Sequence, residues 1–125
     1  LAAAAVGAIL TGEGIPMPTE KADHRALAAP LEQRVFAEPA ETPPQLRQAM
    51  GRRAAGGPPI APPYDDLARQ IGAAAYRVTD AQMAAVRQLA GSDRAAFELV
   101  AAAAVGAALE RWKAGLAAID EASLP

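Results

Sequence analysis

Three side chains in this sequence could support chemistry: His24, Glu98 and Arg111. An imidazole titrates near neutral pH and could act as a base. Glu98 enters an apolar stretch, where a partly buried carboxylate with a raised pKa could serve as acid or base. The guanidinium of Arg111 could bind an anionic ligand through its planar fork. These three residues are the catalytic candidates, and none of them belongs to a catalytic motif.

Each candidate also has a structural interpretation. His24 lies in a polar stretch at residues 20–25, which is typical of a solvated helix face. Arg94 precedes Glu98 by four residues, a spacing that predicts a surface ion pair. Arg111 follows Glu110 directly and could pair with it or with a neighbouring subunit. The structural interpretation is the better supported one for all three.

Composition excludes several classes of function. The chain has no cysteine, which rules out disulfides, thiolate zinc sites and thiol catalysis. Its single histidine cannot build a metal site alone, so we expect no metal and no cofactor. The 12 basic and 14 acidic residues are scattered, which argues against a nucleic-acid surface. The sequence contains no run of 18 apolar residues, so it predicts no membrane-spanning helix.

The prolines divide the chain of 125 residues into two parts. Residues 1–61 read as a proline-punctuated arm with short helices at 20–29, 31–37 and 43–55. Residues 62–125 read as a compact module of three helices, the last one long. The predicted fold is therefore all-α. Residues 1–10 are expected to form a short buried helix; the alternative is a secretory remnant, so a cytoplasmic location is only the default.

Local signals place the helices of the second part. The first is predicted at residues 64–77 after a proline pair. Thr79 and Gln82 have the spacing of a capping box, and the helix that they begin ends at Gly91. Ser92 then caps a helix that is predicted at residues 93–121.

The last helix is apolar on every side between residues 99 and 109, so every side must be covered. Alanine dominates the apolar 52% of the chain and aromatic residues make up 4%, which predicts a thin core and association with further copies or a larger subunit. The alternative is cover by the arm of the same chain. The predicted interface consists of Phe97, Ala101, Ala104, Val105, Gly106, Ala108 and Trp112.

Residues 75–119 resemble the carboxymuconolactone decarboxylase and alkylhydroperoxidase-like family. A Val-Thr-Asp start, a short helix that ends in Leu-Ala-Gly and a Phe-Glu pair that opens the long helix carry the resemblance. The matching positions are Val78, Thr79, Asp80, Val86, Leu89, Ala90, Gly91, Phe97, Glu98, Ala102, Ala103 and Arg111. The resemblance implies an all-helical fold that assembles into rings through helix packing.

The chain departs from that family at its reactive positions. Peroxidase-type members carry a Cys-x-x-Cys pair, and decarboxylase-type members use a histidine that has no counterpart in the matched region here. We therefore predict a non-catalytic assembly or accessory subunit. The first alternative is a thiol-independent enzyme of the lactone decarboxylase type, with Glu98, Arg111 and His24 in one pocket. The second is a module that binds a small apolar ligand in a cavity lined by Phe97, Val105 and Trp112.

Overall fold

The computed structural model describes residues 23–124, and all regular structure in that range is helical, which confirms the all-α prediction. The expected helix at residues 1–10 lies outside the described residues. The elements in chain order are α2 (His24–Glu32), a π-helical turn η1 (Gln33–Ala37), α3 (Pro44–Ala54), α4 (Tyr64–Ala74), a 3₁₀ turn η2 (Ala75–Arg77), α5 (Asp80–Ala90) and α6 (Asp93–Ala122).

One expectation for the arm is wrong. Pro30 was predicted to separate two helical pieces, but α2 continues through it and passes directly into η1. Proline removes the amide that would bond to the carbonyl of Ala26. Ala26 is exposed, so water can replace that hydrogen bond. Asp23 begins the helix, since its carboxylate accepts from the amides of Arg25 and Ala26 at 3.1 and 3.4 Å.

Helix α3 is the part of the arm that packs into the body. Pro44 occupies the first turn, where a missing amide costs nothing, and Gly56 follows the helix with a positive φ of 99°. Arg47 is buried, and its guanidinium donates to the carbonyls of Val35 and Glu38. A single arginine therefore holds η1 and the following turn against α3.

The helices of the second part begin at the predicted caps. Thr79 and Gln82 form the capping box of α5 with hydrogen bonds of 3.1 and 2.9 Å, and Gly91 ends that helix in the left-handed region. Ser92 Oγ accepts from the amide of Ala95 at the start of α6. These local signals define the elements that carry the candidate residues.

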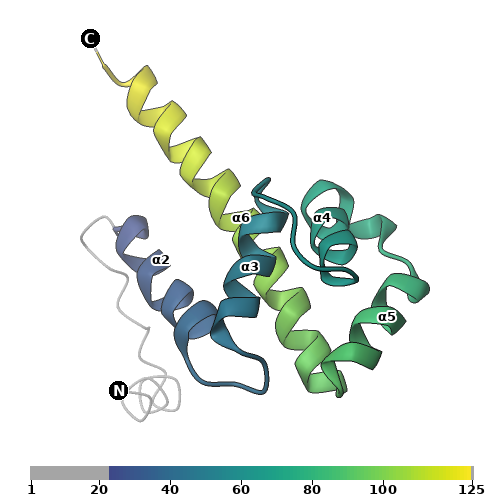
Figure 1. Cartoon of the computed structure of the whole chain (residues 1–125). Helices are drawn as coiled ribbons and strands as arrows, with labels where there is room; N and C mark the ends of the chain where they lie inside the picture. Colours follow the sequence, from purple (N-terminus) through teal and green to yellow (C-terminus); the bar gives the residue numbers. More distant parts are fainter. Residues whose placement is uncertain (1–22, 125) are drawn as a thin grey trace, which may run out of the picture.

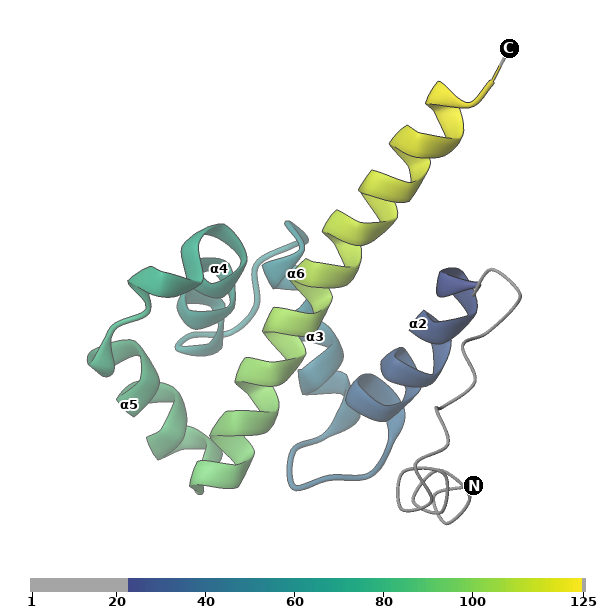
Figure 2. The ribbon, with the colours of Figure 1, turned by 180° about the vertical axis from the view of Figure 1, so that it is seen from behind.

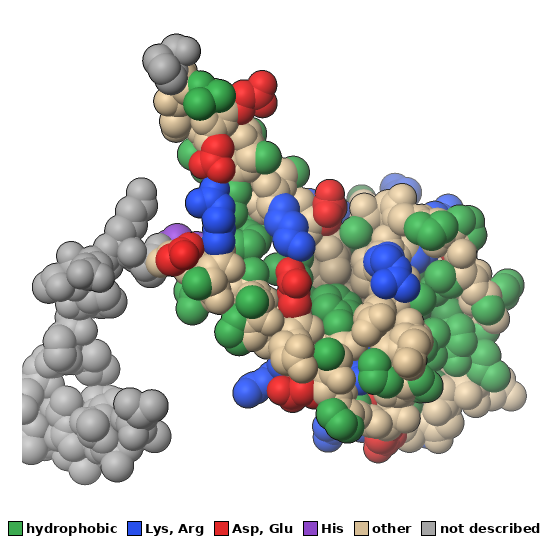
Figure 3. All heavy atoms as spheres, turned by 60° about the vertical axis from the view of Figure 1, so that its left-hand side comes forward, with side chains coloured by type: hydrophobic (Ala, Val, Ile, Leu, Met, Phe, Trp, Pro, Cys, Tyr) green, Lys and Arg blue, Asp and Glu red, His purple; other side chains and the backbone are tan. Residues whose placement is uncertain are grey.

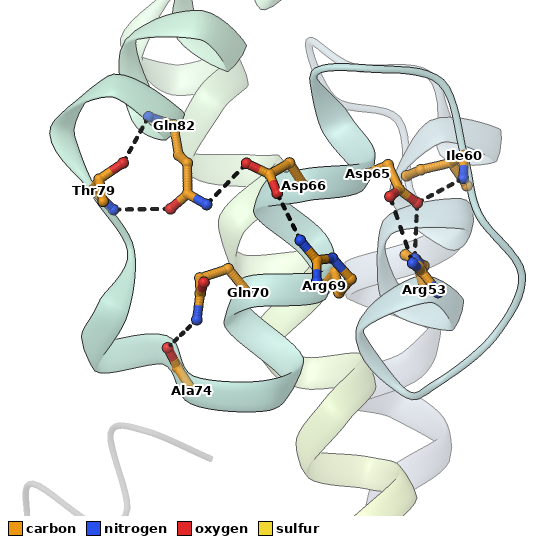
Figure 4. A network of polar contacts seen from close by, with 9 residues as sticks. All are labelled: Arg53, Ile60, Asp65, Asp66, Arg69, Gln70, Ala74, Thr79 and Gln82. Atoms are coloured by element: carbon orange, nitrogen blue, oxygen red, sulfur yellow. Dashed lines mark hydrogen bonds and ion pairs between the residues drawn. The ribbon is translucent and has the colours of Figure 1, made fainter.

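A polar network joins the start of α4 to its neighbours (Figure 4). Asp65 accepts from Arg53 Nε at 2.8 Å and from the amide of Ile60 at 3.0 Å, and the pKa of Asp65 is lowered mainly by that amide. Asp66 accepts from Gln82 and from Arg69, each at 3.0 Å, and these bonds lower its pKa. The network fixes α4 between α3 and α5.

The core lies between α6 and the three helices α3, α4 and α5. Two close approaches make it compact: a Cβ on Gly72 would overlap the backbone of Ala54, and a Cβ on Gly106 would overlap the backbone of Gly51. The buried apolar cluster consists of Met50, Ala54, Leu67, Ala68, Ile71, Val86, Leu99, Ala102, Ala103 and Ala107.

Helix α6 forms the spine of the molecule and extends beyond it. Its first half is flanked by α3, α4 and α5, and its second half projects away from these helices with α2 beside it (Figure 1). Seen from behind, α6 passes in front of α3, and no helix crosses in front of α6 (Figure 2). No helix in the range 23–124 is both long enough and apolar enough to cross a membrane.

Candidate interaction surface

Glu98 is held by the turn before α3. Its side chain is 9% exposed, and Oε1 accepts from the amide and the hydroxyl of Thr42 at 2.9 and 2.8 Å. Oε2 accepts from the amide of Glu41 at 3.2 Å and from Arg94 Nε at 3.3 Å. The predicted ion pair with Arg94 is confirmed. Glu98 therefore links the start of α6 to a segment more than fifty positions earlier in the chain.

The catalytic interpretation of Glu98 required a raised pKa, and the shift has the opposite direction. Burial raises the pKa of this carboxyl, but the hydrogen bonds from Thr42, Glu41 and Arg94 outweigh burial and lower it to about 2. The sequence shows only the apolar helix around Glu98, whereas the donors come from elsewhere in the chain. A carboxylate that stays ionised and accepts four hydrogen bonds serves as an anchor and is poorly suited to general acid or base chemistry.

Arg111 and His24 are positioned away from Glu98 and from each other. Arg111 follows Glu98 on α6 by thirteen residues, about 20 Å along the axis. Its guanidinium donates to the carbonyl of Gly72 in α4, which is a structural contact. His24 is exposed at the start of α2, beside Arg25, which pairs with Asp120 near the end of α6 at 2.5 Å. The three candidates share no pocket.

The predicted interface residues divide between two sides of α6. The inner side is covered by the chain itself, and it includes Gly106, whose close neighbour is Gly51 of α3. The backbone approach expected at Gly106 is therefore made within the chain, by the arm. The other predicted residues lie on what we call the outer face: Phe97, Ala101, Ala104 and Ala108, with Val105 and Trp112 at one edge. Gly115 and Ile119, which were not predicted, continue this face toward the end of α6.

The outer face is apolar and uncovered by the described residues. Phe97 and Ile119 are 68% and 63% exposed, and Ala104, Ala108 and Gly115 are exposed as well. The spacing of four and three residues from Phe97 to Ala108 is that of a helix–helix seam. Figure 2 looks onto α6 from the side on which no other helix crosses it. Such a row of small and large apolar side chains is typical of an interaction site.

A groove lies between α2 and the second half of α6. One part has a cavity volume of about 430 Å³ and is lined by Phe36, Gly106 and Leu109 among others. A second part of about 460 Å³ is lined by Trp112 and Leu116. The ion pair of Glu32 with Lys113, at 3.1 Å, lies between the two parts. Figure 3 shows this side, with hydrophobic side chains between the charged ones.

The cavity predicted for an apolar ligand does not form as expected. Trp112 lines the groove beside α2, whereas Phe97 lines a separate hollow against α5 together with Met83 and Val100. Val105 lines neither of them. Phe97 and Trp112 are fifteen residues apart, about 22 Å along α6, so they meet different neighbouring helices although they lie toward the same side of α6.

Residues 23–124 contain no cluster of three or more side chains suited to hold a metal ion. The chain matches no protein-family model, no curated protein and no solved structure. The resemblance to the carboxymuconolactone decarboxylase family therefore stays a prediction, and the surface geometry carries the functional argument.

Proposed function

We propose that this protein is a non-catalytic assembly or accessory subunit that associates through the outer face of α6. The observation that carries the proposal is the exposure of Phe97 and Ile119 on a row of alanine and glycine residues. Exposed apolar side chains in water cost about 25 cal/mol per Å² relative to buried ones, so cover by a helix of another chain is favourable.

The arrangement of the polar candidates supports the same conclusion. Glu98 and Arg111 make hydrogen bonds that join elements of the fold. His24 contacts neither of these two residues. The geometry does not favour an enzyme of the lactone decarboxylase type, which would need these residues to converge on one pocket. A non-catalytic assembly or accessory subunit does not require any of these three residues to react.

The test is the mass of the chain in solution, by sedimentation velocity, for the wild type and for Ala104→Glu. We expect the wild type to exceed its single-chain mass of 12.8 kDa, alone or in native extract, and Ala104→Glu to lose that association. Ala114→Glu is the matched control, since Ala114 is exposed on another side of α6. A single-chain mass for the wild type under both conditions would overturn the proposal.

The groove beside α2 favours a second candidate function, the binding of a small apolar ligand. Its cavity volume of about 430 Å³ falls within the range of ligand pockets. Trp112 is the only tryptophan and lines the adjoining part, so its fluorescence reports on occupancy. A blue shift on addition of a fatty acid or an aromatic probe, abolished by Ala29→Trp, would support this function, and an unchanged spectrum would contradict it.

A further inference from the structure

We infer that the first part of α2, residues 24–29, is a hinged lid over the second half of α6, which two ion pairs hold closed and which salt opens. Opening uncovers the apolar side chains of Trp112 and Leu116. The lid lies on the groove side of α6, so its movement is independent of association through the outer face. It controls access to the groove, but it needs no ligand in order to move.

The η1 end of the segment that carries the lid is fixed to α3. Arg47, which is buried, donates to two backbone carbonyls of η1 and the turn after it. Gln48 Nε2 donates to the carbonyl of Phe36 at 3.1 Å. The ring of Phe36 lies so close to Gly51 that a Cβ on this glycine would be 2.6 Å from it. Both polar and apolar contacts therefore hold this end in place.

Helix α2 is held more weakly than η1. It contains no buried residue. Pro30 lies inside it and leaves the carbonyl of Ala26 without an amide partner, and the wider π-helical turn η1 follows directly. Prolines and π-helical turns are the places at which helices bend. The hinge is therefore the junction at residues 30–33, with the lid before it and the fixed turn after it.

The facing sides of α2 and α6 carry the same charge pattern. Each side has a basic residue, two apolar residues and an acidic residue at positions i, i+3, i+4 and i+7, which share one face of a helix. The residues are Arg25, Ala28, Ala29 and Glu32 on α2, and Lys113, Leu116, Ala117 and Asp120 on α6.

The two patterns are complementary because the helices run antiparallel here. Arg25 pairs with Asp120 at 2.5 Å, and one heptad away Glu32 pairs with Lys113 at 3.1 Å. Charged side chains of both signs lie along this side of the molecule (Figure 3). A displacement of α2 by one turn, about 5 Å, would break both pairs. The charges therefore define the closed position of the lid.

A cavity of about 460 Å³ lies between the facing sides, and the residues of both ion pairs line it. Ala28 and Ala29 are too small to fill the space opposite Trp112 and Leu116, so apolar contact across the groove is limited. The charged side chains are between 40% and 66% exposed, and exposed pairs are weak and screened by salt. The closed position is therefore only slightly favoured, and the lid opens without unfolding the rest of the chain.

The first test measures the exposure of Trp112, the only tryptophan of the chain, at a concentration that keeps the chain monomeric. Acrylamide is an uncharged quencher, so salt does not attract or repel it. We expect the quenching constant to rise at least about 1.5-fold between about 0.01 and 1 M NaCl, as the Debye length falls from about 30 to about 3 Å. A constant that does not rise would overturn the inference.

Variants of the Arg25–Asp120 pair test whether charge closes the lid. At low ionic strength, Asp120→Asn should move the quenching constant at least halfway to the high-salt value of the wild type. Arg25→Asp with Asp120→Arg exchanges the two charges and should restore the wild-type constant. Glu121→Gln is the matched control, since Glu121 is exposed and belongs to none of the ion pairs among residues 23–124. Equal constants for Asp120→Asn and Glu121→Gln would contradict closure by charge.

The second test measures the movement directly. The chain lacks cysteine, so Leu27→Cys with Ala118→Cys places nitroxide labels at exposed positions of the lid and of α6. We expect salt to add a population at a distance longer by at least about 5 Å, one helical turn. Ala37→Cys with Ala118→Cys is the control pair, because Ala37 belongs to the fixed turn and its distance should not change. Unchanged distances for both pairs would refute the lid, and equal changes would refute the hinge at residues 30–33.

These outcomes are distinguishable from failure of the proposed functions. A lid that opens with salt in a chain whose Trp112 spectrum no apolar probe changes keeps the inference and refutes the ligand function. A fixed α2 in a chain that loses association in Ala104→Glu keeps the assembly function and refutes the lid.

Discussion

The inner and outer sides of α6 have similar compositions and different surroundings. Leu99, Ala102 and Ala103 on the inner side are completely buried against α3, α4 and α5. Ala104 and Ala108 on the outer side are exposed, and Phe97 is more exposed than any inner residue. Alanine and glycine allow a neighbouring helix to come close on either side. The comparison shows that α6 carries small apolar side chains on two sides, of which the described residues cover one and leave the other exposed.

The strongest contrast between the two sides should come from truncation of one large side chain on each. Leu99→Ala removes a completely buried side chain and should lower the free energy of unfolding by about 4 kcal/mol. Phe97→Ala should change it by less than about 0.5 kcal/mol when the chain is dilute enough to be monomeric. Urea denaturation of both variants measures the difference. Equal losses would mean that Phe97 is covered within the monomer.

The link between α6 and the turn before α3 should depend on pH. The pKa of Glu98 is lowered from 4.5 to about 2, so its stabilising contribution is complete above pH 4.5 and is lost as the pH falls toward 2. A shift of that size corresponds to about 3 kcal/mol at neutral pH. Denaturation of the wild type between pH 6 and 2 should show this loss.

Glu98→Gln is the control for that measurement. The amide side chain does not titrate, so the variant should be less stable at neutral pH and should lose less stability than the wild type on acidification. Parallel curves for the two proteins would show that other carboxylates account for acid sensitivity and that Glu98 is not the anchor of this side of α6.

Two glycines on the same helix sharpen the comparison further. Gly106→Ala forces a Cβ into the backbone of Gly51 and should lower the free energy of unfolding by about 2 kcal/mol. Gly115→Ala places a Cβ in open space and should raise it by about 1 kcal/mol through helix propensity. Thermal denaturation gives both values. Stabilisation by both substitutions would contradict the close contact of α3 with α6.

Local signals in the sequence predicted the helix boundaries of the second part well. The capping box at Thr79 and the cap at Ser92 involve residues three positions apart, so their pattern is complete within a short window. The break predicted at Pro30 is wrong because the rule that proline ends a helix does not consider solvent. Water can bond to the exposed carbonyl that loses its amide partner. Helix propensity and capping signals therefore predicted where these helices begin and end, but they did not predict that a helix would continue through Pro30.

The surroundings of α6 were harder to predict because they depend on contacts distant in sequence. A helix that is apolar on every side does not indicate which of its sides the chain itself will cover. The sequence therefore left two alternatives for the neighbour of Gly106, another chain or the arm that contains α3. The environment of Glu98 shows the same limit: its four donors include Thr42 and Glu41, and their presence reverses the direction of the pKa shift. Residue type and spacing on one helix carry no information about donors supplied by another segment.

The smallest expected effect concerns the second half of α6, where α2 is the neighbouring helix. The ion pair of Arg25 with Asp120 joins side chains that are 57% and 66% exposed, so solvent and salt screen it. Asp120→Asn should change the free energy of unfolding by less than about 0.5 kcal/mol. Urea denaturation at low and at high ionic strength measures this change. A loss of more than about 1 kcal/mol at low salt would show that the pair, and not the apolar groove, holds α2 against the second half of α6.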